Sequence, residues 1–151
     1  MSKQYTGVYS IATTGTFSGA RELIGLTAAS DRGIEIIRAE FGLFGSTSPP
    51  DEMLRSTMGP VTSSGDGAPS TERPFHPNYP TASAVGTQNG ASVHTLQTLL
   101  HFGFHIQQGI LYLPDEDERM AVAGGDEWGW NLVTGPAASQ SFSWHIVWGE
   151  L

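Results

Sequence analysis

The clearest alternation of hydrophobic and polar positions lies in the last segment of the chain, residues 141–150. Its even positions are large and apolar, whereas three odd positions are polar: Phe142, Trp144, Ile146 and Trp148 against Ser141, Ser143 and His145. Successive side chains of a strand point to opposite faces, so this period of two predicts a strand with one core face and one wetter face. Val147 is the exception. Because two of the four Trp share the apolar face, we expect this strand at the centre of the core, with the C-terminus held in a sheet.

Two earlier segments, residues 22–28 and 34–44, show the same alternation. The apolar sets are Ile24, Leu26 and Ala28 in the first, and Ile37, Ala39, Phe41 and Leu43 in the second. Ser30-Asp31-Arg32-Gly33 between them has turn composition, because Ser and Asp bond their own backbone and Gly accepts a positive φ. A helix over 34–44 is the alternative, but the β-branched start and Gly42 favour a strand. The two segments therefore predict a hairpin.

Further short strands are predicted along the rest of the chain. Pro60 is expected to end the strand at 53–61 or to confine it to an edge. Residues 94–104 fit either one strand or two turns of helix. The remaining predicted strands cover residues 106–113, 119–123 and 128–133, and a weak strand is predicted within residues 81–93. Turns at this spacing indicate an all-β, single-domain antiparallel β-sandwich or jelly roll.

Residues 1–20 are rich in Thr, Ser and Gly, with aromatic residues spaced among them. We interpret them as an extended N-terminal arm with one short strand at residues 7–12, preceding a sandwich domain at 21–151. Tyr5 and Tyr9 are the arm's candidate partner contacts, although such aromatics also pack on their own domain.

Residues 62–80 form the least regular part of the chain. Loops of this length inside a compact domain are uncommon and are usually functional or disordered. Phe75, His76 and Tyr79 stand among Pro74, Pro77 and Pro80. Aromatic side chains stiffened by Pro make a contact element of low conformational entropy. These three residues are therefore candidate partner contacts, the alternative being a loop folded onto its own domain.

Composition and charge exclude several classes of function. The 151 residues include 19 Gly and 9 Pro, with a net charge of −8. Scattered bases and an acidic balance disfavour binding to nucleic acid or to an anionic membrane. No Cys is present, which excludes disulfides, thiol nucleophiles and thiolate metal sites. The N-terminus lacks the apolar segment of a signal peptide and no window has the length of a transmembrane helix, so we expect a soluble chain made in the cytoplasm.

Three His and one acidic run raise the question of a metal. His94, His101 and His105 have no Cys or neighbouring acid to complete a ligand set, and a ligating His normally has a further partner. Residues 115–118 are acidic but lack the spacing of a calcium loop. We therefore expect ordinary His side chains, a solvated turn and no metal or other cofactor.

No catalytic motif stands out. The chain has no Gly-x-Ser-x-Gly, phosphate-binding loop or dinucleotide fingerprint, and paired carboxylates cannot be recognised from sequence. Trp128 and Trp130 share one strand face; they are candidate contacts that stack a sugar ring or a subunit, or they belong to the core. We expect no enzyme. The alternative function is a carbohydrate-binding or adhesion module that uses Trp128, Trp130 and Tyr79.

Five segments follow one another along the chain: Ala28-Ala29-Ser30-Asp31-Arg32-Gly33-Ile34-Glu35-Ile36, Phe104-His105-Ile106-Gln107-Gln108-Gly109, Tyr112-Leu113-Pro114, Arg119-Met120-Ala121-Val122 and Trp148-Gly149-Glu150. Their order resembles that of small structural proteins of tailed bacteriophages that decorate or cement the capsid. Together they span a little over half of the chain, and residues 62–80 have no counterpart among them.

This resemblance implies a β-sandwich, often a homotrimer, on the outer surface of a virion capsid. The partner would be the major capsid protein, with neighbouring capsomers bridged and no nucleic acid or membrane bound. An acidic chain would stay away from packaged DNA. Many weakly bound copies can stabilise a shell together. We therefore expect a non-enzymatic virion protein made in the host cytoplasm.

Overall fold

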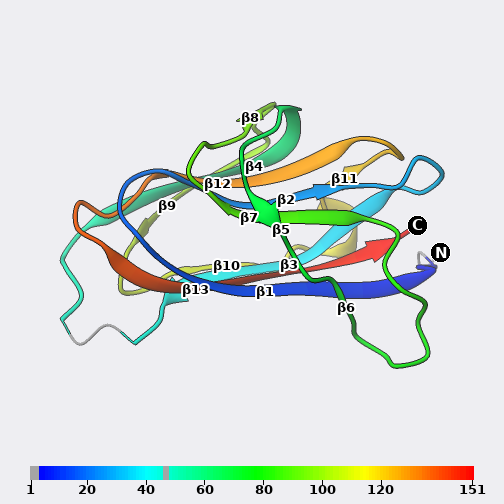
Figure 1. Cartoon of the computed structure of the whole chain (residues 1–151), viewed down its shortest axis with the longest axis horizontal. Helices are drawn as coiled ribbons and strands as arrows, with labels where there is room; N and C mark the ends of the chain where they lie inside the picture. Colours follow the sequence, from blue (N-terminus) through cyan, green and yellow to red (C-terminus); the bar gives the residue numbers. More distant parts are fainter. Residues whose placement is uncertain (1–3, 46–47) are drawn as a thin grey trace.

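Two antiparallel sheets pack face to face in the computed structural model, which describes residues 4–45 and 48–151 (Figure 1). Sheet A has the order β10 (Ile110–Tyr112), β3 (Ile34–Leu43), β13 (Gln140–Glu150), β1 (Gly7–Phe17) and β6 (Arg73–Pro74), and β11 (Ala121–Val122) also pairs with β3. Sheet B has the order β5 (Ala68–Pro69), β7 (Val85–Gly90), β2 (Arg21–Thr27), β12 (Glu127–Thr134), β4 (Met53–Ser63) and β8 (Thr95–Leu96), and β9 (Leu100–His105) also pairs with β4. The expectation of an all-β sandwich is confirmed.

Helical structure is confined, in the described part of the chain, to the 3-10 turn η1 (Glu116–Glu118). It occupies the acidic turn expected at residues 115–118. No helix among the described residues is long and apolar enough to cross a membrane.

Strand β13 holds the centre of sheet A, as its alternation predicts. It pairs with β1 along its whole length and with β3 on its other side. The four large apolar side chains on its inner face are buried: Phe142, Trp144, Ile146 and Trp148. The Nε1 of Trp144 donates a hydrogen bond of 2.9 Å to the carbonyl of Leu23 in β2. The last strand therefore ties the two sheets together.

Strand β1 is longer than the sequence indicates. It spans eleven residues, Gly7–Phe17, and lies between β13 and β6. The strand expected at residues 7–12 is thus correct but incomplete, and residues 7–17 belong to the sandwich instead of a separate arm. The Thr-rich stretch still alternates, with Thr14 and Thr16 exposed and Phe17 buried, and its pairing with β13 is unbroken. The start of the expected arm, residues 1–3, lies outside the described residues.

The hairpin expected from residues 22–44 does not form, although both strands exist. β2 pairs with β7 and β12 in sheet B, whereas β3 pairs with β10 and β13 in sheet A. The turn at residues 30–33 therefore carries the chain from one sheet to the other. Both strands need to bury an apolar face. Two strands in opposite sheets of a sandwich bury their apolar faces as well as two neighbouring strands of one sheet do.

A bulge changes which side chains of β3 enter the core. The pairing with β13 shifts between Val147 and Trp148, which lie opposite Arg38 and Ile36. Such a bulge leaves one residue unpaired and reverses the alternation beyond it. As a result Ile36 is fully buried, while Ile37, expected on the core face, is only partly buried.

Three other expectations are resolved by strand positions. Strand β4 continues through Pro60 to Ser63, because there it changes partner from β9 to β8 and the missing N–H of Pro is tolerated. The weak strand expected within residues 81–93 is present as β7 at Val85–Gly90. Residues 94–104 form strand, in β8 and β9, and not helix.

Candidate interaction surface

The loop at residues 73–80 follows strand β6 along the edge of sheet A and projects from the body of the sandwich (Figure 1, green). Its backbone is fixed at two points. The amide of Phe75 donates a 2.9 Å hydrogen bond to the carbonyl of Val8 in β1, and the amide of Tyr79 donates one of 3.0 Å to the carbonyl of His76. The Asn78 amide also donates to Nδ1 of His76 at 3.2 Å. We call residues 73–80 the aromatic loop.

The side chains of the aromatic loop brace one another. The Tyr79 ring lies 5.7 Å from that of His76 and 6.5 Å from that of Tyr9, between ring centroids. The Phe75 side chain has no such ring partner among the described residues and is 62% exposed. A rigid loop that offers a large apolar side chain loses little entropy when a partner binds it. The structure therefore brings together three of the predicted contacts, Phe75, His76 and Tyr79.

The two candidate contacts from the N-terminal segment both pack within the chain, and Tyr9 supports the aromatic loop from inside. Tyr9 is fully buried beneath Tyr79 and against Trp148. Tyr5 is partly buried; its hydroxyl donates to the Glu35 carboxylate and accepts a 2.8 Å hydrogen bond from Arg119. Burial, followed by the hydrogen bond to Glu35, raises the pKa of Tyr5. Both tyrosines are thus internal contacts within this chain.

Trp128 and Trp130 are not exposed at the protein surface. Both are 0% exposed on the inner face of β12, and the Trp130 Nε1 donates a 2.6 Å hydrogen bond to the hydroxyl of Ser56. The prediction that they are candidate contacts is therefore wrong: both rings belong to the core, because the two sheets cover them. Of the three aromatics invoked for a carbohydrate module, only Tyr79 reaches the surface.

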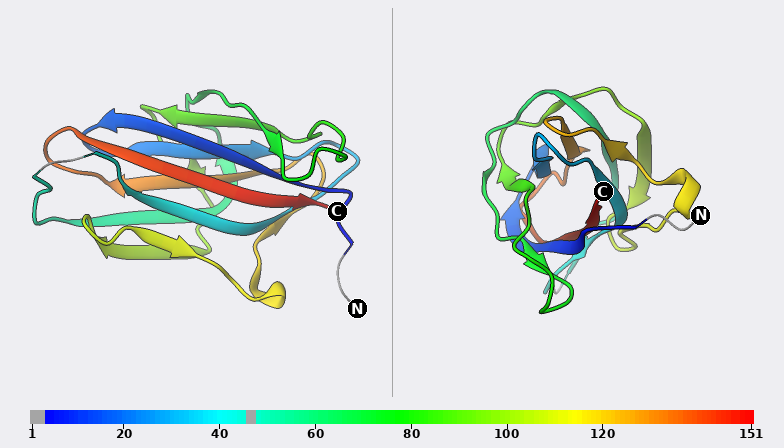
Figure 2. Two further views of the ribbon diagram at one scale, coloured as in Figure 1. Left: turned by 90° about the horizontal axis from the view of Figure 1, so that it is seen from below. Right: turned by 90° about the vertical axis from the view of Figure 1, so that its right-hand side faces the viewer.

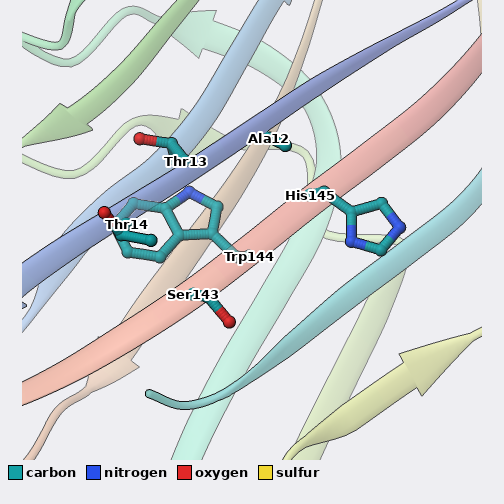
Figure 3. Close-up of a pocket in the computed structure, with 6 residues that line it drawn as sticks. All are labelled: Ala12, Thr13, Thr14, Ser143, Trp144 and His145. Atoms are coloured by element: carbon teal, nitrogen blue, oxygen red, sulfur yellow. The ribbon is translucent and has the colours of Figure 1, made fainter. Parts of the chain in front are cut away.

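The polar face of the last strand lies on the open side of sheet A. An open hollow between β1 and β13 is lined by Ala12, Thr13, Thr14, Ser143, Trp144 and His145 (Figure 3). A second hollow on the other side of β13 shares Ser143 and His145 and also includes Glu40 and Leu111. The Nδ1 of His145 lies 3.4 Å from the Glu40 carboxylate. Short side chains leave this face smooth and polar, without an enclosed cavity at either hollow.

A buried polar cluster, not foreseen from the sequence, lies on the outer face of sheet B. The Glu22 carboxylate accepts hydrogen bonds from the Thr87 hydroxyl at 2.7 Å and the Gly67 amide at 2.8 Å. His94 Nε2 lies 3.2 Å from Glu22, and Nδ1 accepts a 2.9 Å hydrogen bond from the Gly65 amide. Glu22, His94, Gly65 and Gly67 thus fasten the chain at 63–67 over the sheet. In the sequence, the signal for this cluster is Glu22, a single acidic residue next to the apolar residues of β2.

The pKa of Glu22 reflects this cluster. Burial alone would raise it, because a charged carboxylate loses hydration. The His94 ring beside it, together with the hydrogen bonds donated by Thr87 and Gly67, outweighs burial and holds the pKa of Glu22 below its usual value of 4.5. Glu22 is therefore a carboxylate at neutral pH.

The three His raised as metal candidates do not converge. His94 is buried in the cluster on sheet B, and His105 Nε2 lies 2.7 Å from Asp51. The carboxylates of Glu22 and Glu127 approach different ring nitrogens of His94, so they cannot share one ion with it. Among the described residues, no group of three or more His, Asp or Glu is arranged to hold a metal ion.

The aromatic loop and the open face of sheet A are therefore two surfaces that combine exposure with defined geometry. The loop contributes a fixed aromatic contact, and the face of β1 and β13 contributes a smooth polar area beside it. Neither arrangement resembles a set of reacting groups. No protein-family model, curated protein or solved structure matches the chain.

Proposed function

We propose that this chain is a non-enzymatic structural protein of a tailed-bacteriophage virion. It decorates the outer surface of the capsid as a homotrimer, bridges neighbouring capsomers of the major capsid protein and stabilises the shell. The protein is made in the host cytoplasm and needs no cofactor, nucleic acid or membrane. The proposal joins the resemblance in the sequence to the surfaces of the sandwich.

The observation that carries the proposal is the aromatic loop. Its backbone is hydrogen-bonded to β1 and its rings are braced on Tyr9, so it keeps one shape before a partner arrives. Preorganisation raises affinity mainly by lowering the entropy lost on binding. On a shell, many copies then act together, so each contact can be modest.

Charge supports the same role. With 15 acidic and 7 basic residues, the chain carries a net charge of −8. Phosphate backbones repel such a protein at low ionic strength. An acidic protein is therefore suited to the outside of a container filled with DNA, where its contacts are with protein.

Binding to shells tests the proposal directly. Expanded, DNA-free shells of the major capsid protein encoded in the same genome would be mixed with the purified chain and sedimented. We expect the chain to sediment with the shells at a saturating, regular stoichiometry. We also expect the decorated shells to disrupt at a higher temperature than bare shells, as measured by calorimetry.

Two substitutions locate the contact. His76→Ala, in the aromatic loop, is expected to weaken shell binding, whereas His101→Ala, an exposed His on β9, should leave it unchanged. Equal binding by both variants would move the contact away from the aromatic loop. Absence of the wild-type chain from sedimented shells would contradict the proposed function itself.

A further inference from the structure

An apolar hollow lies at the β10 edge of sheet A. It is lined by Leu100, Leu111, Tyr112, Leu113, Pro114 and Glu118 and has a volume of about 480 Å³. Leu111 and Leu113 are 59% and 65% exposed. Exposed Leu side chains that gather around a hollow, with a carboxylate at its rim, are typical of an interaction site.

The floor of this hollow is firmly built. The Tyr112 ring is buried and meets the Phe102 ring edge-on at 6.3 Å. Its hydroxyl donates a 3.3 Å hydrogen bond to the carbonyl of Glu118, which fixes the end of the acidic turn at 115–118 to the strand. The hollow is therefore a stable feature with an acidic rim.

The opposite edge of sheet A carries the complementary features. The strand order places β10 at one edge and β6 at the other, and Figure 2 (left) shows the two edges on either side of β3, β13 and β1. At the β6 edge Phe75 is 62% exposed, and Arg73, two residues before it, is exposed as well. One edge thus presents an aromatic side chain beside a cation, and the other an apolar hollow beside carboxylates.

We propose that the partner of this hollow is a second copy of the chain. Phe75 of one copy enters the hollow of the next, and Arg73 faces Glu118 and the acidic turn at its rim. This inference rests on the self-association within the proposed function and assigns the surfaces that carry it.

Charge complementarity selects this occupant. The chain has only 7 basic residues against 15 acidic ones, so most of its surface would be repelled by the acidic turn. The Arg73–Phe75 segment brings an apolar anchor and a positive charge to the same place, and aromatic and Arg side chains are the usual anchors of interfaces. Oppositely charged rims also set the orientation of the two copies.

The rotation between copies decides whether this contact gives a closed ring or an open chain of copies, and the proposed homotrimer requires a closed ring. The two surfaces are different patches on opposite edges, so the interface is heterologous, and such interfaces close into cyclic oligomers when the rotation between copies allows it. A trimer needs three identical contacts of this kind. Every hollow is then filled and every Phe75 is covered, which leaves His76 and Tyr79 of the aromatic loop for the shell contact.

Light scattering coupled to size exclusion tests the apolar contact. Wild-type protein is expected to be oligomeric, while Phe75→Asp and Leu113→Asp each yield monomers that keep the circular-dichroism spectrum of the wild type. Phe44→Asp is the matched control: Phe44 is 57% exposed at the end of β3, and this variant should remain oligomeric. A monomeric wild type, or oligomers that survive both substitutions, would overturn the inference.

Charge reversal tests the orientation. Arg73→Glu and Glu118→Arg are each expected to weaken association by about tenfold, and the double variant to recover most of that loss, because opposite charges again meet across the interface. Two single losses that simply add in the double variant would contradict the assigned pairing.

Cysteine exchange gives a test independent of affinity, since the chain has no Cys of its own. A mixture of Phe75→Cys and Leu113→Cys is expected to form a disulfide-linked dimer under mild oxidation, whereas either variant alone does not. Linked dimers from Phe75→Cys alone would indicate a two-fold contact instead.

These outcomes separate the inference from the proposed function. A monomer that still decorates shells overturns the inference and leaves the capsid role standing. A ring built on Phe75 that never binds shells supports the inference and contradicts the proposed function.

Discussion

Trp144→Ala is expected to lower the free energy of unfolding by about 3–5 kcal/mol, the usual cost of removing a large aromatic side chain from a core. Trp144 is only 2% exposed, and its ring lies 5.9 Å from that of Phe17 and 6.1 Å from that of Phe41. Its Nε1 also donates to the carbonyl of Leu23. The substitution therefore opens a cavity and removes a hydrogen bond that joins sheet A to sheet B.

Urea denaturation followed by circular dichroism measures this effect, with two companion variants. Trp144→Phe keeps an aromatic ring but strands the Leu23 carbonyl, at a cost of about 1–3 kcal/mol. Ser143→Ala, the next residue on the opposite face of β13, should change stability by less than about 0.5 kcal/mol. If Trp144→Ala were no more harmful than Ser143→Ala, the core position of β13 would be wrong.

The contrast between Trp144 and Ser143 also explains why the strands were predictable. Whether a residue faces the core depends on the two-residue period of a strand, which is a local property. The alternation in residues 141–150 therefore identifies the buried face of β13 before any neighbour is known. The same reasoning found the core residues Ile24 and Leu26 in β2.

Pairing between strands was less predictable, because it depends on contacts between distant parts of the chain. An apolar face does not specify whether its strand lies beside the next strand or across the core from it, so β2 and β3 were wrongly joined as a hairpin. The bulge that buries Ile36 instead of Ile37 is set by the register with β13. Neither feature leaves a signal within its own segment.

The candidate surfaces also differ in whether local sequence or contacts between distant segments create them. The Pro-flanked aromatics of the aromatic loop were recognisable from composition, since Pro restricts the backbone locally. The hollow at the β10 edge was not, because Leu100 and Leu113 meet only after β9 and β10 have taken their places. Trp128 and Trp130 looked like candidate contacts because their alternation shows one shared face but not whether a second sheet covers it.

The buried cluster around Glu22 shows the same limit and leads to the second large effect. Glu22 and His94 are far apart in sequence, and both are almost fully buried in the fold. Together they accept hydrogen bonds from the Gly67 and Gly65 amides, while Ser64 donates to Glu127. The segment at 63–67 is therefore held over sheet B by the polar side chains below it, without apolar packing of its own.

Glu22→Gln is expected to destabilise the protein by about 1–3 kcal/mol at pH 7, because an amide replaces a hydrogen-bonded carboxylate in a buried site. Glu40→Gln is the matched control: Glu40 is 32% exposed on the open face of sheet A, where it pairs with Arg38 and His145, and losing its charge there should cost less than about 1 kcal/mol. Urea denaturation of both variants and of the wild type, repeated over a series of pH values, measures the difference.

The pH dependence of that difference distinguishes a charged role for Glu22 from simple packing. The folded pKa of Glu22 lies below its usual value of 4.5, so folding favours the carboxylate over the protonated acid. A group of this kind stabilises the folded state above its unfolded pKa, and the stabilisation is lost as the pH falls through the folded pKa. The difference in the free energy of unfolding between wild type and Glu22→Gln should therefore be constant from pH 7 to pH 6 and should become smaller at pH values below 4.5. A gap that stayed the same down to pH 3 would show that Glu22 stabilises the fold through shape and hydrogen bonds alone, without its charge.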